Sequence, residues 1–271
     1  MIIIADNLNV MQTDFARALA SLDSEPVRAK VRECLQRGTQ GLDINPGPLR
    51  KRPEACMTFL VETVQAMTDL PLLLDTTNAA AMAAGLRACR SRAIINGFSL
   101  ESVKLDHILP LAQQFDADLI GYLLHPDSQV PIDETEMMEV AVALFKAFTD
   151  AGLNPARLII DPVVAPLSWQ EGARHNRAVL KVIDTLPDLL GISVRTIAGI
   201  SNLTSGPMPV ARKIALEQTF LPMLAAAGLD MALINVRHTA TVETARICTG
   251  LLGEQVFAWT ARGQDPNGPG R

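Results

Sequence analysis

The chain has 271 residues, of which 48% are hydrophobic and 20% are charged, and its formal net charge is -5. This length admits two small domains or one large domain, and it allows a substantial core. The scattered basic residues argue against nucleic-acid binding, and the absence of any run of about eighteen apolar residues argues against a transmembrane helix.

Eight short apolar runs are predicted to be buried strands, because each is too short for a helix. In chain order they cover residues 2–6, 41–45, 72–75, 93–96, 119–124, 158–161, 198–202 and 232–235. All of them close on Asp or Asn except 119–124, which is followed by His125. A polar group is therefore expected at nearly every strand end.

Segments with helical spacing lie between these strands. They cover residues 14–20, 24–37, 53–68, 79–89, 99–115, 134–151, 170–186, 211–227 and 239–250, with Ser24 and Ser99 as expected caps. Strict alternation without a dividing linker predicts a single-domain (β/α)8 TIM barrel over residues 1–260. An open doubly wound sheet is the alternative, since one sequence does not reveal strand order. We expect the Gly- and Pro-rich tail, 261–271, to be disordered.

The start of the chain and the cysteines suggest a cytoplasmic protein. Residues 1–6 lack the basic start and longer apolar stretch of a signal peptide. Cys34, Cys56, Cys89 and Cys248 lie far apart with no Cys-x-x-Cys spacing, which favours reduced thiols and predicts no metal site.

The polar residues at the strand ends predict one shared site. In a (β/α)8 barrel, the carboxyl ends of all strands converge on one rim, where active sites lie. The alternative is that each Asp or Asn caps a helix or forms a turn. Ser and Thr would cap equally well, yet they hardly occur at these positions, so a binding rim is the better interpretation.

The composition of this rim argues against several chemistries. No Lys lies at a strand end, as a Schiff-base aldolase needs, and only His125 is near enough to join a hydrolytic metal site. The turns after the last two strands lack the glycines of a phosphate site. A set of carboxylates and carboxamides suits a flat, nitrogen-rich heterocycle whose edge carries both donors and acceptors.

The motifs at the strand ends resemble those of a known family. They are Leu42-Asp43-Ile44-Asn45, Leu74-Asp75-Thr76-Thr77-Asn78, Gly85-Leu86, Ile95-Asn96, Ile160-Asp161-Pro162 and Gly199-Ile200-Ser201-Asn202. Together they resemble the pterin-binding methyltransferases, in particular the methyltetrahydrofolate:corrinoid/iron-sulfur protein methyltransferases and the tetrahydrofolate methyltransferase components of O-demethylase systems. The resemblance runs from Met1 to about Trp259.

This resemblance implies a role for each of these residues. Asp75, Asn96 and Asp161 would hold the polar edge of the pterin ring. Asn202 would lie beside N5, the nitrogen that carries the methyl group. Asp43, Asn45, Gly199 and Ser201 would complete the pocket, with Asn202 and Asp161 as the catalytic pair.

One segment departs from the family pattern. The family usually carries Glu-Arg-Ile-Asn after the first strand, whereas this chain has Asp6-Asn7-Leu8-Asn9. The loop after Asn202 is also longer here. The role of the Asp6–Asn9 segment therefore stays open.

The resemblance also implies the substrates and partners. Tetrahydrofolate or 5-methyltetrahydrofolate would be a substrate, and a corrinoid would arrive on a separate protein, because the chain has no Asp-x-His-x-x-Gly cobalamin motif. A homodimer is implied, with no metal held by this chain. The methyl transfer would be of the O-demethylation, betaine demethylation or acetyl-CoA pathway type, and its direction stays open. The rival functions are dihydropteroate synthase and a non-catalytic pterin-binding barrel.

Overall fold

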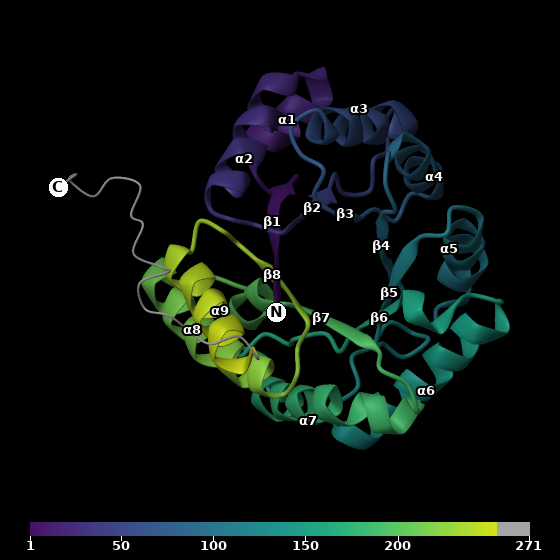
Figure 1. The fold of residues 1–271 in the computed structure, drawn as a ribbon, viewed down its shortest axis with the longest axis vertical. Coiled ribbons are helices and arrows are strands. Elements are labelled where there is room, and N and C mark those ends of the chain that lie inside the picture. Colours follow the sequence, from purple (N-terminus) through teal and green to yellow (C-terminus); the bar gives the residue numbers. More distant parts are fainter. Residues whose placement is uncertain (254–271) are drawn as a thin grey trace.

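A computed structural model of the chain describes residues 1–253. Its eight strands pair in parallel in chain order, and the last strand pairs with the first, so the sheet is a closed barrel surrounded by helices (Figure 1). The strands are β1 Ile2–Asn9, β2 Gly41–Asn45, β3 Leu72–Leu74, β4 Ile94–Phe98, β5 Asp118–Tyr122, β6 Leu158–Asp161, β7 Arg195–Gly199 and β8 Met231–Ile234. The predicted (β/α)8 barrel is confirmed.

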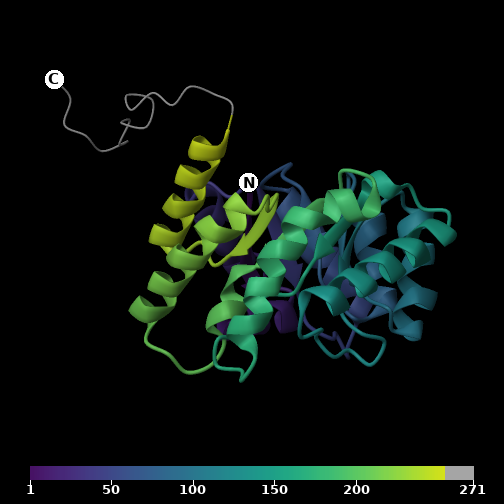
Figure 2. The ribbon, with the colours of Figure 1, turned by 90° about the horizontal axis from the view of Figure 1, so that it is seen from below.

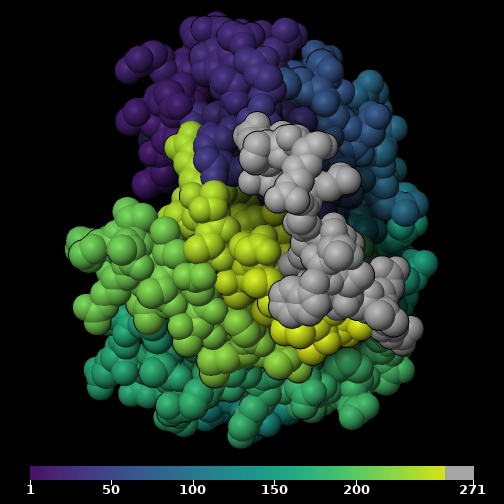
Figure 3. Space-filling view, turned by 60° about the vertical axis from the view of Figure 1, so that its left-hand side comes forward, coloured from purple at the N-terminus to yellow at the C-terminus, as the bar shows by residue number. Residues whose placement is uncertain are grey.

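Closure of the barrel excludes the open-sheet alternative. Ile2 to Ala5 of β1 pair in register with Met231 to Ile234 of β8. Segments from the two ends of the described chain consequently lie side by side, as the adjoining purple and yellow surfaces show (Figure 3). The expectation of a disordered tail at 261–271 and the domain boundary at 260 lie outside the described residues.

The helices surround the barrel and cover the outer face of the strands. They are α1 Thr13–Ser21, α2 Ser24–Gln36, α3 Pro53–Gln65, α4 Ala79–Ala88, α5 Ser102–Gln114, α6 Glu134–Asp150, α7 Gly172–Leu190, α8 Val210–Ala226 and α9 Thr239–Leu252, with short 3-10 helices η1 Pro155–Arg157 and η2 Ile200–Thr204. Neighbouring helices pack side by side, as α8 and α9 do (Figure 2). Among residues 1–253, no helix has both the length and the apolar character needed to cross a membrane.

The helix starts differ slightly from the expected caps. The carboxylate of Asp23, rather than Ser24, accepts a hydrogen bond from the first turn of α2. The helix expected from Ser99 begins at Ser102, after Glu101. Asp and Ser cap equally well, so such shifts by a few residues leave the architecture unchanged.

Several strand ends differ from the prediction by one to three residues, and the differences at β1, β5 and β7 affect the rim. β1 continues to Asn9 because its ladder to β2 resumes at Leu8 after an irregularity. β7 ends at Gly199, and the expected strand end 200–202 instead forms part of η2. β5 ends at Tyr122, before His125.

Two apolar layers hold the fold together. A large core lies between the strands and the helices and includes Phe15, Met57 and Phe148. A smaller core fills the inside of the barrel, and its buried members are Ile4, Leu73, Ile94, Ile120, Ile159, Ile197 and Met231. This inner layer closes the barrel below the rim, so any ligand must bind above it.

Candidate functional site

The inner core predicts which side chains form the rim. Because side chains alternate along a strand, the residue two positions after an inward-facing one also faces inward. This relation joins Ile4 to Asp6, Leu73 to Asp75, Ile94 to Asn96, Ile120 to Tyr122, Ile159 to Asp161 and Ile197 to Gly199. An apolar layer is thus followed by a polar layer at the carboxyl ends of the strands.

Hydrogen bonds connect the polar side chains of β2 to β5. The Tyr122 hydroxyl donates to Oδ1 of Asn96 at 2.6 Å, and Nδ2 of Asn96 donates to Oδ1 of Asp43 at 3.1 Å. Nδ2 of Asn45 donates to Oδ2 of Asp75 at 2.5 Å. These contacts fix the orientation of the Asn96 amide and bring four of the predicted pterin residues together.

Burial makes the carboxyl groups of this layer hard to ionise. Burial raises the pKa of Asp75 from 3.8 to about 6 and that of Asp161 to about 7. Burial, followed by the neighbouring charge of Asp75, also raises the pKa of Asp43 well above its ordinary value. A ligand that offers N–H donors would stabilise these carboxyl groups in their ionised form, because each hydrogen bond from a donor favours the carboxylate.

Asp161 stands somewhat apart from the hydrogen-bonded group. It is buried at the end of β6, where its Oδ1 accepts a hydrogen bond from the backbone N–H of Val163 at 2.8 Å. Its charge contributes to the raised pKa of Tyr122, after the larger effect of burial and alongside Asp75. Asp161 therefore faces the same polar layer from the next strand.

The predicted catalytic amide lies on the other side of the rim. Asn202 is exposed on η2, and a Cβ added at Gly199 would lie 3.1 Å from its Nδ2. The preceding residue, Ser201, donates from Oγ to Oδ2 of Asp6 at 3.1 Å. Within residues 1–253 no hydrogen bond joins the Asn202 side chain to Asp161, so a direct contact within this predicted catalytic pair is absent.

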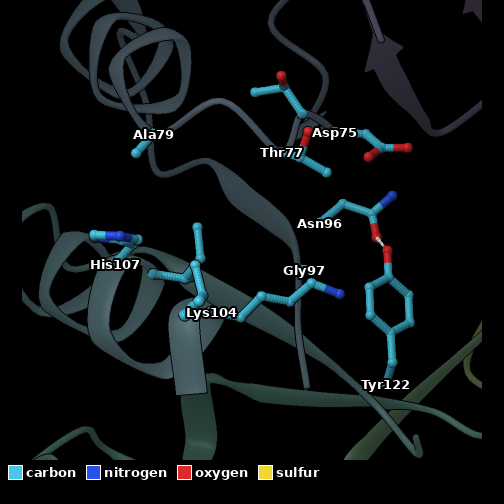
Figure 4. A pocket seen from close by; sticks show the side chains of 11 residues that line it. Asp75, Thr77, Ala79, Asn96, Gly97, Lys104, His107 and Tyr122 are labelled. Atoms are coloured by element: carbon cyan, nitrogen blue, oxygen red, sulfur yellow. Dashed lines mark hydrogen bonds between the residues drawn. The ribbon is translucent and has the colours of Figure 1, made fainter. Parts of the chain in front are cut away.

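A cavity of about 190 Å³ opens beside the hydrogen-bonded group. Asp75, Asn96 and Tyr122 form one wall, while Lys104 reaches toward them from α5 (Figure 4). Lys104 is paired with Glu101 at 2.8 Å. Of the predicted site residues, Asp75 and Asn96 line this cavity, whereas Asp161 and Asn202 do not.

The cap-and-turn alternative is partly right. Oδ1 of Asn45 accepts from the N–H of Gly47, and Oδ1 of Asp161 accepts from Val163, as in turns stabilised by Asx side chains. The helix caps, however, are other residues, such as Asn78 on α4 and Asp133 on α6. The strand-end residues thus form turns or hydrogen-bond to one another at the barrel mouth, and they do not cap the helices.

Tyr122 was missed by the sequence reasoning. It is the only tyrosine of the chain and follows Ile120 by two positions on a strand expected to end at Leu124. Its inward alternation with Ile120 was the available signal. His125, beyond it, forms a partly exposed pair with Glu136 at 3.4 Å.

Comparison with known proteins identifies the family. The model of a family described as pterin binding enzyme matches residues 6–235. A methylcorrinoid:tetrahydrofolate methyltransferase from Eubacterium limosum is 24% identical over 239 residues, covering 87% of this chain and 85% of the relative. Methionine synthase from Mycobacterium tuberculosis is 23% identical over 82% of this chain, which spans only 19% of that longer protein.

Solved structures show the same barrel. The Yersinia pestis DHPS with a pterine-sulfa conjugate superposes with a TM-score of 0.68 at 16% identity, and 92% of each chain is covered. The dihydropteroate synthase of Xanthomonas albilineans with 4-aminobenzoic acid gives a TM-score of 0.65 at 19% identity, again with 92% of each chain covered. At such identities the agreement extends to the fold alone.

Proposed function

Because this chain belongs to the pterin-binding enzymes, we propose that it moves a methyl group between N5 of tetrahydrofolate and the cobalt of a corrinoid carried by a separate protein. The main support is the division of the rim into two sides. A hydrogen-bonded set of acids and amides lies on one side, and the Asn202 amide, which makes no hydrogen bond within the described residues, lies on the other. A pterin bound by its polar edge would then present N5 to Asn202.

The polar side has the chemistry that a pterin edge requires. Asp75 and Asp161 would accept hydrogen bonds from the amino group and ring N–H groups, while Asn96 would both donate and accept. Asp43 and Asn45 would hold these groups in place through their own hydrogen bonds. Gly199 and Ser201 would line the N5 side, where Gly199 leaves room for the Asn202 amide.

Asn202 would act on the leaving nitrogen. Unprotonated N5 is a poor leaving group when its methyl group is transferred. N5 must therefore gain a proton before or during the transfer. The Asn202 carbonyl oxygen can accept a hydrogen bond from protonated N5 and stabilise that state. In the reverse direction, the same pocket presents the N5 lone pair to a methylated corrinoid.

The relative from Eubacterium limosum, similar over most of its length, favours this reaction over others of the family. We propose a corrinoid protein as partner, docking over the rim, and a cytoplasmic homodimer acting in O-demethylation or a related one-carbon pathway. Dihydropteroate synthase is the second candidate because the dihydropteroate synthase of Xanthomonas albilineans has the same barrel fold.

A spectral assay of cobalamin tests the proposal directly. The purified protein should demethylate 5-methyltetrahydrofolate with free cob(I)alamin, and it should methylate tetrahydrofolate with methylcobalamin. Comparison of the two rates gives the favoured direction. Condensation of 4-aminobenzoate with the pterin diphosphate would establish the rival function instead, and folate binding without either reaction would leave a non-catalytic binding protein.

A further inference from the structure

A buried acid lies next to the η2 turn that carries Asn202, and it is not among the residues proposed to bind the pterin. Glu217 of α8 is 2% exposed, and its carboxylate accepts three side-chain hydrogen bonds. The donors are Thr204 Oγ1 at 3.2 Å, Thr241 Oγ1 at 3.1 Å and His238 Nδ1 at 2.7 Å. Three donors around one carboxylate hold the Glu217 side chain in one position.

Glu217 fixes the orientation of His238. Because Nδ1–H donates to the carboxylate, the neutral imidazole keeps its lone pair on Nε2. Within residues 1–253 no hydrogen bond reaches Nε2, and the side chain is 13% exposed. The neighbouring Arg237 pairs with Glu33 of α2 at 2.9 Å. Nε2 is thus available to exchange a proton with solvent.

Asp6 links this pair to the Asn202 turn. Burial raises the pKa of Asp6 to about 6, the Ser201 hydrogen bond lowers it, Glu217 raises it and His238 lowers it. Contacts in the η2 turn join Asp6 to the Glu217 side. The Asp6 carboxyl accepts from Ser201, and Thr204 Oγ1 lies 3.4 Å from the Ser201 carbonyl oxygen and 3.2 Å from Glu217. Glu217 reaches the same turn from behind, through Thr204.

We propose that Asp6, His238 and Glu217 form a proton relay on the Asn202 side of the barrel mouth. Asp6 is the acid that gives its proton to N5 of the folate, and His238, held by Glu217, returns a proton to Asp6 through water. This inference rests on the proposed methyl transfer. It also assigns a role to the segment in which the chain departs from the family pattern.

The step balances in protons and electrons. The Asp6 carboxyl transfers its proton to N5, and the electron pair of the carbon–N5 bond then stays on N5 as the methyl group leaves. Two electrons of the cobalt(I) corrinoid form the new carbon–cobalt bond, and the cobalt becomes cobalt(III). The His238 imidazolium restores the Asp6 proton and is itself reprotonated from solvent. In the reverse direction the released proton follows the same route outward.

The competing explanation is a purely structural clamp. Glu217 would then serve only to hold the η2 turn through Thr204. Thr204→Val removes that contact and leaves the His238–Glu217 pair in place, so it separates the two explanations. A clamp predicts equal losses for Thr204→Val and His238→Gln at every pH, whereas a relay predicts a loss in His238→Gln that depends on pH.

The test compares Asp6→Asn, His238→Gln and Thr204→Val in the full chain. We expect Asp6→Asn to slow single-turnover methyl transfer from 5-methyltetrahydrofolate to cob(I)alamin by about 10²-fold. His238→Gln should slow multiple-turnover transfer by about tenfold at neutral pH, since it removes the group that returns the proton to Asp6 between turnovers. The loss should shrink as the pH falls, because solvent then supplies the proton. His125→Gln, in the exposed pair with Glu136, is the matched control and should keep the wild-type profile.

A second readout does not depend on turnover. Calorimetry of tetrahydrofolate binding in buffers of different ionisation enthalpy measures the protons exchanged on binding, and Asp6→Asn should change that number while His125→Gln does not. Wild-type pH profiles and unchanged proton exchange in folded Asp6→Asn and His238→Gln variants would overturn the relay. An unreactive wild-type protein would instead refute the proposed function.

Discussion

The Tyr122 hydroxyl donates to the side-chain oxygen of Asn96 at 2.6 Å, and this contact determines how the rim presents an amide to a ligand. With its oxygen held by Tyr122, Asn96 turns its nitrogen toward Asp43. Asn96 is only 5% exposed, so these two contacts are the main constraint on how its amide is oriented. Two strands therefore set the hydrogen-bonding pattern at the base of the pocket.

Replacing Tyr122 with Phe should weaken folate binding more than catalysis. The change leaves the buried Asn96 oxygen without its donor, which costs about 1–3 kcal/mol, or roughly tenfold or more in affinity. Equilibrium titration of tetrahydrofolate measures this loss, and thermal denaturation checks the fold. An unchanged dissociation constant would mean that Asn96 does not contact the pterin.

Asn202→Ala should show the opposite behaviour. Because Asn202 is exposed and its amide makes no hydrogen bond within residues 1–253, the fold does not depend on this side chain. We expect methyl transfer to fall by about 10²-fold, with a smaller change in folate affinity, since the amide acts on the protonated nitrogen. Asn154→Ala, at the start of η1 and outside the rim, is the control. Equal losses of rate and affinity would make Asn202 a binding residue only.

Gly199 was predicted only to line the pocket, and the structure explains why a glycine is suited to this position. An added Cβ would lie 3.1 Å from Nδ2 of Asn202 and 3.5 Å from its Cγ, so Gly199→Ala should shift the amide by a few tenths of an ångström. We expect methyl transfer to fall by about tenfold or more. Single-turnover kinetics beside the thermal unfolding midpoint would measure this, and a wild-type rate would show that the amide can move without loss.

The sequence predicted the barrel and most of the rim for a simple physical reason. Buried parallel strands are short and uniformly apolar, so a terminal Asp or Asn, such as Asp75 or Asp161, stands out clearly. The 3-10 turn at Ile200–Thr204 was not predicted, since its apolar start continues the pattern of the strand. Contacts such as Glu217 with His238 depend on α8 lying beside the start of α9, which only the folded chain reveals.

Asp161→Asn should stabilise the protein at high pH and leave its stability unchanged at low pH. Burial raises the pKa of Asp161 from 3.8, its unfolded value, to about 7 in the folded protein. The folded chain therefore holds a proton that the unfolded chain releases between these values. The stabilising contribution is complete below the unfolded pKa and is lost as the pH rises through about 7. Asparagine cannot ionise, and its oxygen can still accept the Val163 N–H.

The measurement is the thermal midpoint of wild type and Asp161→Asn across this pH range. Above the folded pKa the variant should melt about 5 °C higher, and the difference should disappear as the solution becomes acidic. Asp184→Asn, on the exposed side of α7, provides the matched control for removing one carboxyl group. A constant difference at every pH would mean that Asp161 does not titrate with folding. The Asp161 carboxyl group would then be ionised at the rim before the pterin binds.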